Sequence, residues 1–295
     1  MRIAFEKAGG NCVFSSEWDR FAQKTYECNF GEVPFGDITK IDEKTIPKFD
    51  ILAAGFPCQP FSSIGKRQGF KHKTQGTLFY DVARIIEFHK PSSFLLENVA
   101  GLVTHDKGNT FATIIETLEE LDYTLNYQIL DSADFGVPQK RQRIYIVGFN
   151  NSKVKKSEFL FPKPRRTRVG IGKFVEKGHP ELSISKHLQR VYIYKEKDGR
   201  PEVITSKSDF PVKTLVASYH KIQRLTGTFV KDGPTGLRLL SANECKAIMG
   251  FPKSFKVPVS RTQMYRQFGN SVAVPVVTAI AKSIVKHIEQ NGRRK

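Results

Sequence analysis

The sequence predicts an α/β fold, with a mostly parallel sheet covered by helices on both faces and a small irregular basic domain attached to it. In the first 150 residues, apolar strand-like runs alternate with segments of helical spacing, the order typical of a layered sheet. Residues 151–235 are rich in Lys, Arg, Gly and Pro, and helical spacing returns after Ser241. We therefore expect a catalytic domain formed by residues 1–164 and 236–295, interrupted by a second domain at 165–235.

The elements follow from these patterns in chain order. The predicted strands are Asn11–Ser16, Asp50–Ala54 and Ser93–Glu97, then a closing pair, Tyr123–Leu130 and Arg143–Phe149, with short strand-like runs at Arg190–Tyr194 and Val212–Ala217. The predicted helices are Arg2–Ala8 with Gly9 as its cap, Trp18–Phe30, Leu78–His89, Thr110–Leu121, Asn243–Met249 after a Ser cap, and Val274–Glu289.

Charge indicates the kind of partner. The chain has 47 Lys and Arg against 29 Asp and Glu, a net charge of +18, and residues 151–235 carry 19 against 8. This excess favours a polyanion such as nucleic acid, although ribosomal and membrane-surface proteins are equally basic and the middle segment could be only a solvated lysine-rich insert.

Other composition features exclude several classes. The sequence lacks an apolar run of the roughly 18 residues that a membrane span needs and lacks the apolar core of a signal peptide. Its four cysteines are scattered without a C-x-x-C pair, so we expect no disulfide framework, no metal site and a reducing cytoplasm.

Cys58 has the most informative context of the four cysteines. It lies in Gly55-Phe56-Pro57-Cys58-Gln59-Pro60-Phe61-Ser62, directly after a predicted strand. Ligands of α/β sheets gather beyond the carboxyl ends of strands, and proline on both sides fixes the path of the loop. A cysteine is ordinarily a small core residue, but this long string favours a nucleophile.

An acid and two arginines end or precede other strands. Glu97-Asn98-Val99 closes an apolar strand, where desolvation would raise the pKa of Glu97 and make it a proton donor; a helix cap or an ion pair is the ordinary alternative. Arg141 and Arg143 alternate before the last strand, so both should project from one side. Two guanidiniums suit phosphate or carbonyl recognition, and a solvated edge is the alternative.

Further candidates suit an adenosine-containing cofactor. Glu17 would bind ribose hydroxyls, Trp18 would flank the adenine, and Asp37 would hold its exocyclic amine. Near the C-terminus, Gln267-Phe268-Gly269-Asn270-Ser271-Val272 offers a glycine turn and an amide just before a helix. Each of these signals is weak by itself.

Together these segments resemble the cytosine-5 DNA methyltransferase family, particularly the bacterial restriction–modification enzymes. The resemblance rests on five segments in family order, namely the Pro57-Cys58-Gln59 loop, Glu97-Asn98-Val99, Gln139 to Arg143, Arg238–Pro252 and Phe268–Val272. It covers nearly the whole chain except the basic middle, which occupies the position of the family's target-recognition domain.

The resemblance implies a function and a set of site residues. It implies a Rossmann-like, S-adenosylmethionine-dependent enzyme that methylates carbon-5 of a flipped cytosine in duplex DNA. Cys58 would add to carbon-6, Glu97 would protonate or hydrogen-bond ring nitrogen 3, Arg143 would hold the base's carbonyl oxygen, and Arg141 would assist. The implied contacts are, for the cofactor, Glu17, Trp18, Asp37, Ile38, Pro57, Leu78, Asn270, Ser271 and Val272, and, for DNA, Gln59, Ser62, Thr214 and Tyr219.

One family feature is not found. The family opens with a strand and a glycine-rich loop, but here Glu17 lies only seven residues beyond the Gly9-Gly10 pair, whereas roughly 20 residues are needed for the intervening helix. We therefore expect the chain to begin just after that loop and to lack the first strand of the sheet, which would weaken cofactor binding.

Two alternatives stay open. The chain could be an impaired fragment or subunit that binds DNA without methylating it, or it could belong to the tRNA-modifying branch of the family. We expect a cytoplasmic monomer that acts on double-stranded DNA beside a possible cognate restriction endonuclease.

Overall fold

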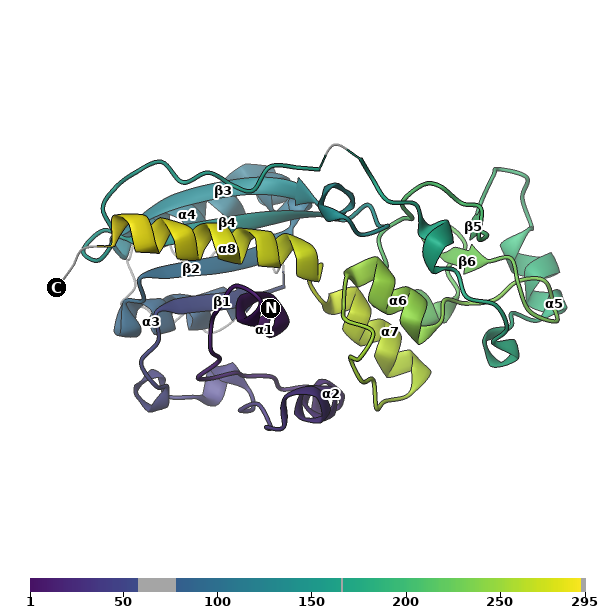
Figure 1. Cartoon of the computed structure of the whole chain (residues 1–295), viewed down its shortest axis with the longest axis horizontal. Coiled ribbons are helices and arrows are strands. Elements are labelled where there is room, and N and C mark those ends of the chain that lie inside the picture. Colours follow the sequence, from purple (N-terminus) through teal and green to yellow (C-terminus); the bar gives the residue numbers. More distant parts are fainter. Residues whose placement is uncertain (58–77, 166, 293–295) are drawn as a thin grey trace.

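Four strands form the central sheet of this computed structural model, which describes residues 1–57, 78–165 and 167–292. Their order is β1-β2-β4-β3, where β1 is Ile51–Gly55, β2 is Ser93–Val99, β3 is Tyr123–Asp131 and β4 is Gln142–Asn150. β1 and β2 run parallel, whereas β4 runs antiparallel to both β2 and β3 (Figure 1).

The sheet confirms part of the prediction and corrects the rest. The strands expected from Asp50 to Phe149 form close to their predicted bounds, including the closing pair. Three of the four described strands, β1, β2 and β3, run in one direction, as expected for a mostly parallel sheet. Only β4 runs against them, because the short β3–β4 connection leaves no room for a crossover helix. Asn11–Ser16 is not a buried strand, since it makes a single bridge, Ser16 to Phe35, and Val13 is 47% exposed.

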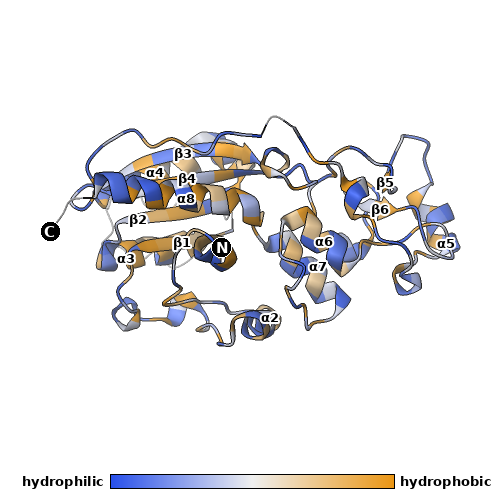
Figure 2. Cartoon of the chain, in the orientation of Figure 1, coloured by the Kyte–Doolittle hydropathy of each residue, from blue (hydrophilic) through white to orange (hydrophobic). Residues whose placement is uncertain are grey.

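Helices cover both faces of the sheet, as predicted. α3 (Leu78–His89) and α4 (Asn109–Glu120) pack on one face, and α1 (Arg2–Glu6) and α8 (Val274–Asn291) pack on the other. The side chains of β2 alternate between these layers, with Phe94 and Leu96 on the α3–α4 side and Leu95 on the α8 side. Burial on both sides explains why β2 reads as a continuous apolar run (Figure 2).

The first helices begin and end where local chemistry dictates. α1 is shorter than the predicted Arg2–Ala8 helix, and the turn that follows it ends at Gly9 with a φ of +89°. α2 (Arg20–Phe30) starts at Asp19, whose carboxylate accepts the backbone N–H groups of Phe21 and Ala22. The predicted helix therefore forms, with Trp18 outside it.

Short helices connect these elements. They are η1 (Ile38–Lys40), η2 (Glu43–Thr45), η3 (Ala100–Gly108), η4 (Ser132–Phe135), η5 (Ile171–Phe174), η6 (Pro180–Leu182), α5 (Lys186–Leu188), η7 (Gln189–Ile193) and η8 (Tyr219–Lys221).

A second hydrophobic core lies beside the sheet. This second core is the buried cluster that runs from Ile171 to Phe268, and it contains the parallel pair β5 (Glu202–Ile204) and β6 (Thr228–Val230). It continues past residue 235 through α6 (Ala242–Met249) and α7 (Arg261–Asn270), which join it to the sheet in Figure 1.

The predicted strand-like runs within residues 151–235 do not form strands. Arg190–Tyr194 falls mostly within a single π-helical turn, η7. Val212–Ala217 makes one isolated bridge, from Val212 to Gln139, and its other backbone groups are bonded largely by side chains. The prediction was wrong here because Arg190–Tyr194 is mostly helical and the backbone of Val212–Ala217 bonds side chains of Glu202, Gln139 and Arg141 in place of a neighbouring strand.

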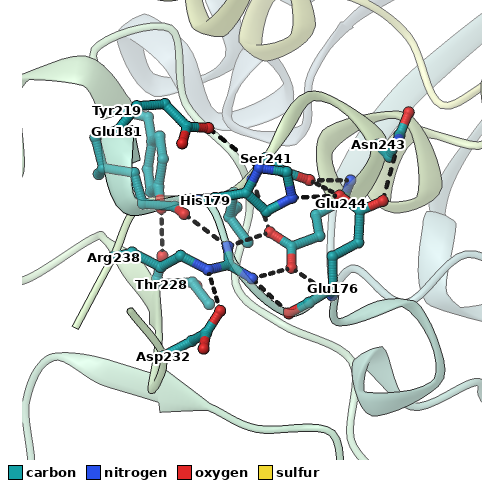
Figure 3. Close-up of polar contacts among 12 residues, drawn as sticks. Glu176, His179, Glu181, Tyr219, Thr228, Asp232, Arg238, Ser241, Asn243 and Glu244 are labelled. Carbon is teal, nitrogen blue, oxygen red and sulfur yellow. Dashed lines mark hydrogen bonds and ion pairs between the residues drawn. The ribbon is translucent and has the colours of Figure 1, made fainter. Parts of the chain in front are cut away.

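A buried ionic network organises the second core. The side chain of Arg238 is fully buried and donates to both carboxylate oxygens of Glu244 at 2.8 Å and to Asp232 at 2.9 Å (Figure 3). Glu244 also completes a capping box with Ser241 at the start of α6. A buried guanidinium needs such complete pairing, so this network fixes α6 against the second core.

One stretch, Arg261–Asn291, is long and apolar enough to cross a membrane by length and composition. It consists of α7 and α8, which are interrupted at residues 271–273, and 56% of its most apolar window is buried inside the protein. The buried residues of α8 face the sheet. The apolar residues of this stretch are therefore explained by their packing in the protein core.

Candidate active site

The carboxyl ends of β1 and β2 bring the first site residues together. In the ladder, Gly55 pairs with Glu97, Glu97 pairs with Tyr145, and Val99 pairs with Arg143. Because successive side chains of a strand alternate in direction, Glu97, Tyr145 and Arg143 share one face of the sheet. Glu97 and Arg143, the predicted acid and the second predicted arginine, thus meet at the edge of the sheet formed by the carboxyl ends of β1 and β2.

Glu97 and Arg143 form a mostly buried ion pair. Arg143 Nε lies 3.2 Å from Glu97 Oε1, and the two side chains are 15% and 12% exposed. Burial raises the pKa of Glu97, an effect opposed by the charges of Arg143, Arg141 and the Met1 amino group. Desolvation outweighs these cations, so the predicted rise in the pKa of Glu97 is confirmed.

Small and amide residues shape the surroundings of Glu97. A Cβ at Gly55 would lie 3.4 Å from Glu97 Oε2, an ordinary van der Waals contact, so Gly55 lies directly beside the carboxylate. Asn98 is buried and donates from Nδ2 to the carbonyl of Phe56 at 2.9 Å, while its Oδ1 accepts the N–H of Val99. Asn98 therefore fixes the backbone just before Pro57, which is exposed. The predicted nucleophile Cys58 and the predicted DNA contacts Gln59 and Ser62 lie outside the described residues.

Arg141 is not placed with Glu97 as an open catalytic side chain. It is 3% exposed, and its Nη atoms donate to the carbonyls of Leu215, Gly269 and Ser271. Burial lowers the pKa of Arg141 to about 10, so the group is still a cation at neutral pH. Its charge acts on Glu97, but its hydrogen bonds serve the protein backbone.

The predicted adenosine contacts lie on two neighbouring segments. Glu17 N donates to Phe35 O at 2.8 Å, and this brings Glu17 beside the segment that carries Asp37. Burial raises the pKa of Glu17, and Trp18 is 76% exposed. Asp37 caps η1 through Oδ1, and Ile38 and Leu78 are half-buried.

The C-terminal candidates form the turn between α7 and α8. Asn270 is exposed, Ser271 donates from Oγ to Phe268 O at 2.8 Å, and Val272 is buried with the α8 side of the sheet. This segment was predicted as a turn because glycine and asparagine commonly form turns, but Gly269 and Asn270 are the last residues of helix α7, which was not predicted.

The two described DNA candidates differ in accessibility. Thr214 is half-buried and donates from Oγ1 to Lys140 O at 2.7 Å. Tyr219 is 3% exposed, and its hydroxyl donates to Thr228 O and accepts the N–H of Leu240. The predicted DNA contact at Tyr219 requires an exposed side chain, whereas this ring is part of the second core.

Sequence analysis assigned no role to Gln139, which the structure places among the positioning residues. Its side chain is fully buried, donates from Nε2 to Ile248 O at 3.0 Å and accepts the N–H of Leu215 at 2.6 Å. The available signal was a glutamine within an otherwise basic run, which is too common to indicate burial.

The fold of this chain is that of known methyltransferases. DNMT2 of Spodoptera frugiperda superposes with a TM-score of 0.77 at 22% identity over 96% of both chains, and a putative DNA modification methyltransferase encoded in an E. coli prophage superposes with a TM-score of 0.72 at 19% identity over 97% of this chain and 95% of that one.

Two curated methyltransferases are more similar to this chain in sequence than these two structures are. Type II methyltransferase M.MspI of a Moraxella species is 60% identical over 96% of this chain and 67% of that protein. M.BsuFI of Bacillus subtilis is 54% identical over 98% of this chain and 70% of that protein. Residues 1–286 match the model of the C-5 cytosine-specific DNA methylases. The chain belongs to the C-5 cytosine-specific DNA methylase family, and its reaction is methyl transfer to carbon-5 of cytosine in DNA.

Proposed function

We propose that this chain methylates a cytosine rotated out of duplex DNA, with Cys58 as nucleophile, Glu97 as acid and S-adenosylmethionine as methyl donor. The observation that carries the proposal is the buried Glu97–Arg143 pair, which lies in register with the last residue of the strand that leads to Pro57. A stacked base could not reach this edge of the sheet, so the base must leave the helix.

The proposed chemistry divides one difficult step into easier ones. Carbon-5 of cytosine is a weak nucleophile, and addition of the Cys58 thiolate at carbon-6 makes the ring an enamine. Glu97 protonates or hydrogen-bonds ring nitrogen 3 as negative charge develops there, and Arg143 holds the carbonyl oxygen of the base. Once carbon-5 carries the new methyl group, loss of its proton to a base and breakage of the carbon–sulfur bond release the thiolate and restore the aromatic ring.

The residues of the N-terminal segments fit an adenosine-containing donor. Glu17 supplies a carboxylate for ribose hydroxyls, and Trp18 supplies an exposed aromatic face. We propose that Asp37, Ile38, Pro57, Leu78 and the Asn270–Val272 turn complete the site. When bound, S-adenosylmethionine would supply the electrophilic methyl group.

We propose that the basic residues 165–235 recognise the DNA sequence. Phosphates would be neutralised by its lysines and arginines, and base edges would be read by side chains such as Thr214. Gln59 and Ser62, in the loop that carries Cys58, would add further DNA contacts. The Type II names of M.MspI and M.BsuFI support a restriction–modification role beside a cognate endonuclease. A monomeric cytoplasmic enzyme is the form we expect for that role.

Transfer of labelled methyl groups to duplex DNA and to tRNA tests the substrate, and we expect transfer to DNA. A duplex with 5-fluorocytosine tests the mechanism, because the covalent adduct persists only when the thiol and the methyl donor both act. We expect Cys58→Ser to abolish trapping and turnover and to leave DNA binding intact, with Cys28→Ser, an exposed cysteine, as the control. Turnover by Cys58→Ser would contradict the mechanism, and DNA binding without transfer by the wild type would favour a binding subunit.

A further inference from the structure

Arg141 bonds three backbone carbonyls that lie on two distant segments of the chain. Nη1 donates to Leu215 O at 3.2 Å, and Nη2 donates to Gly269 O at 2.9 Å and to Ser271 O at 2.8 Å. Leu215 belongs to the basic middle, Gly269 lies in α7, and Ser271 lies in the turn proposed for the cofactor. One guanidinium, two residues before Arg143, therefore holds parts of both hydrophobic cores.

The three residues before Arg141 hold the same middle segment. Gln139 accepts the N–H of Leu215 at 2.6 Å, and Lys140 N donates to Val212 O at 2.8 Å. Val212 N in turn donates to Pro138 O at 2.9 Å. The segment 212–215 is therefore bonded to residues 138–141 along most of its backbone.

Gly269 closes the joint from the opposite side. A Cβ at this position would lie 2.2 Å from Ala217 N and 2.4 Å from Val216 C, a separation that real Cβ atoms do not adopt. The backbone of 216–217 therefore packs directly on α7. Arg141, Gln139 and Gly269 together form what we call the recognition joint.

We propose that Arg141 is a positioning residue that sets the register between the DNA-recognition segment 212–217 and the Glu97–Arg143 edge. The inference rests on the proposed function. Its geometric basis is that a fixed fork of N–H donors can bridge three carbonyls of two segments, whereas the single ammonium of lysine cannot. If the joint is loosened, a DNA site can be read in more than one register relative to the flipped base.

The test compares Arg141→Lys, which keeps the positive charge near Glu97, with Gly269→Ala, which disturbs the joint independently. The matched control is Arg2→Lys, because Arg2 has a 17% exposed side chain that pairs with Glu6 and Glu32 outside the basic middle and outside the joint. Each protein methylates bacterial genomic DNA, and bisulfite sequencing gives the ratio of cognate to single-mismatch methylation. Steady-state kinetics give KM for DNA and kcat, and active-site titration gives the active fraction.

We expect Arg141→Lys and Gly269→Ala to lower the cognate-to-mismatch ratio by about tenfold or more and to raise KM for DNA, the loss typical of one charge-assisted hydrogen bond. Arg2→Lys should keep the wild-type ratio. A lower kcat with an unchanged ratio would overturn the proposal and would indicate that Arg141 contacts the base. A lower active fraction with an unchanged ratio would show that the joint serves stability. Loss of folding in both joint variants, but not in the control, would show the same. Failure of the proposed function is distinguished by a wild type that methylates no DNA.

Discussion

At the scale of single residues, Glu97 combines two opposed influences. Its carboxyl is buried enough to resist ionisation, yet Arg143 lies 3.2 Å away. We predict that Glu97→Gln lowers kcat by roughly 10²–10⁴-fold, the usual contribution of a positioned proton donor, because an amide can hydrogen-bond ring nitrogen 3 but cannot protonate it. Labelled-methyl transfer at saturating DNA measures this effect. Glu181→Gln, at a mostly exposed carboxylate, is the control, and a Glu97→Gln variant with wild-type kcat would remove Glu97 from the mechanism.

The raised pKa of Glu97 also predicts a dependence of stability on pH. The folded protein holds this proton more tightly than the unfolded chain does, so the contribution of Glu97 is fully present below its unfolded pKa and is lost as pH rises through the raised folded pKa. A tenfold difference in proton affinity between the folded and unfolded states corresponds to about 1.4 kcal/mol. Urea denaturation across this window should show that the wild type loses stability relative to Glu97→Gln as pH rises. The opposite slope would mean that Arg143, and not burial, determines the ionisation of Glu97.

At the scale of helices and strands, the sequence was informative wherever the cause of an element is local. Leu78–His89 was predicted at its observed bounds, and Ser241 signalled the start of α6 through its capping box. Helix α7 was missed because Gly269 serves a tertiary contact, the close approach of Val216 and Ala217, and not a turn. The backbone of Leu215 is satisfied by the side chains of Gln139 and Arg141, and no local pattern encodes such distant partners.

For the candidate site, too, the features with local causes were predictable from the sequence and those with distant partners were not. The strand-end position of Glu97 follows from an apolar run that ends in an acid, and the spacing of Arg141 and Arg143 predicted that they share a side. What each arginine bonds could not be predicted, because the partners Glu97, Gly269 and Ser271 are distant in sequence. The sequence therefore located the acid at the strand end, and the three-dimensional structure separated the arginine that pairs with Glu97 from the arginine of the joint.

Two helix ends offer a matched test of packing against backbone strain. Gly31 ends α2 and Gly250 ends α6, with φ of +73° and +71°. A Cβ at Gly31 would have no described heavy atom within 4 Å, whereas at Gly250 it would lie 2.3 Å from Pro275 Cδ. We predict that Gly31→Ala costs about 1–2 kcal/mol of unfolding free energy from the left-handed backbone alone. Gly250→Ala should cost a further 1–3 kcal/mol or so through overpacking against α8. Equal losses in urea denaturation would show that α6 and α8 separate freely at this contact.

At the scale of the whole molecule, two cores meet at one edge of the sheet. The sheet carries Glu97 and Arg143, and the second core is built largely from the chain segment with the excess of basic residues. The Arg238–Glu244 network makes the second core rigid, and the recognition joint connects it to β4. Rigid attachment is what sequence-specific chemistry requires, because a site must be read and modified in one fixed register.

The distribution of charge predicts how binding responds to salt. Residues 151–235 hold 19 Lys and Arg against 8 Asp and Glu, so we expect release of counterions from about 6–10 phosphates and a roughly 10³–10⁵-fold loss of DNA affinity between 50 and 200 mM salt. Replacing the exposed Lys195 and Lys197 by alanine should make the slope of log K against log salt shallower by about 0.9 for each lysine that contacts a phosphate. The matched control replaces Lys282 and Lys286, which are exposed on α8. Fluorescence anisotropy on one duplex measures both slopes, and an equal effect of the two double variants would show that DNA responds to net charge and not to the basic middle. A selective effect would place the duplex against the second core, because only charges near phosphates displace counterions.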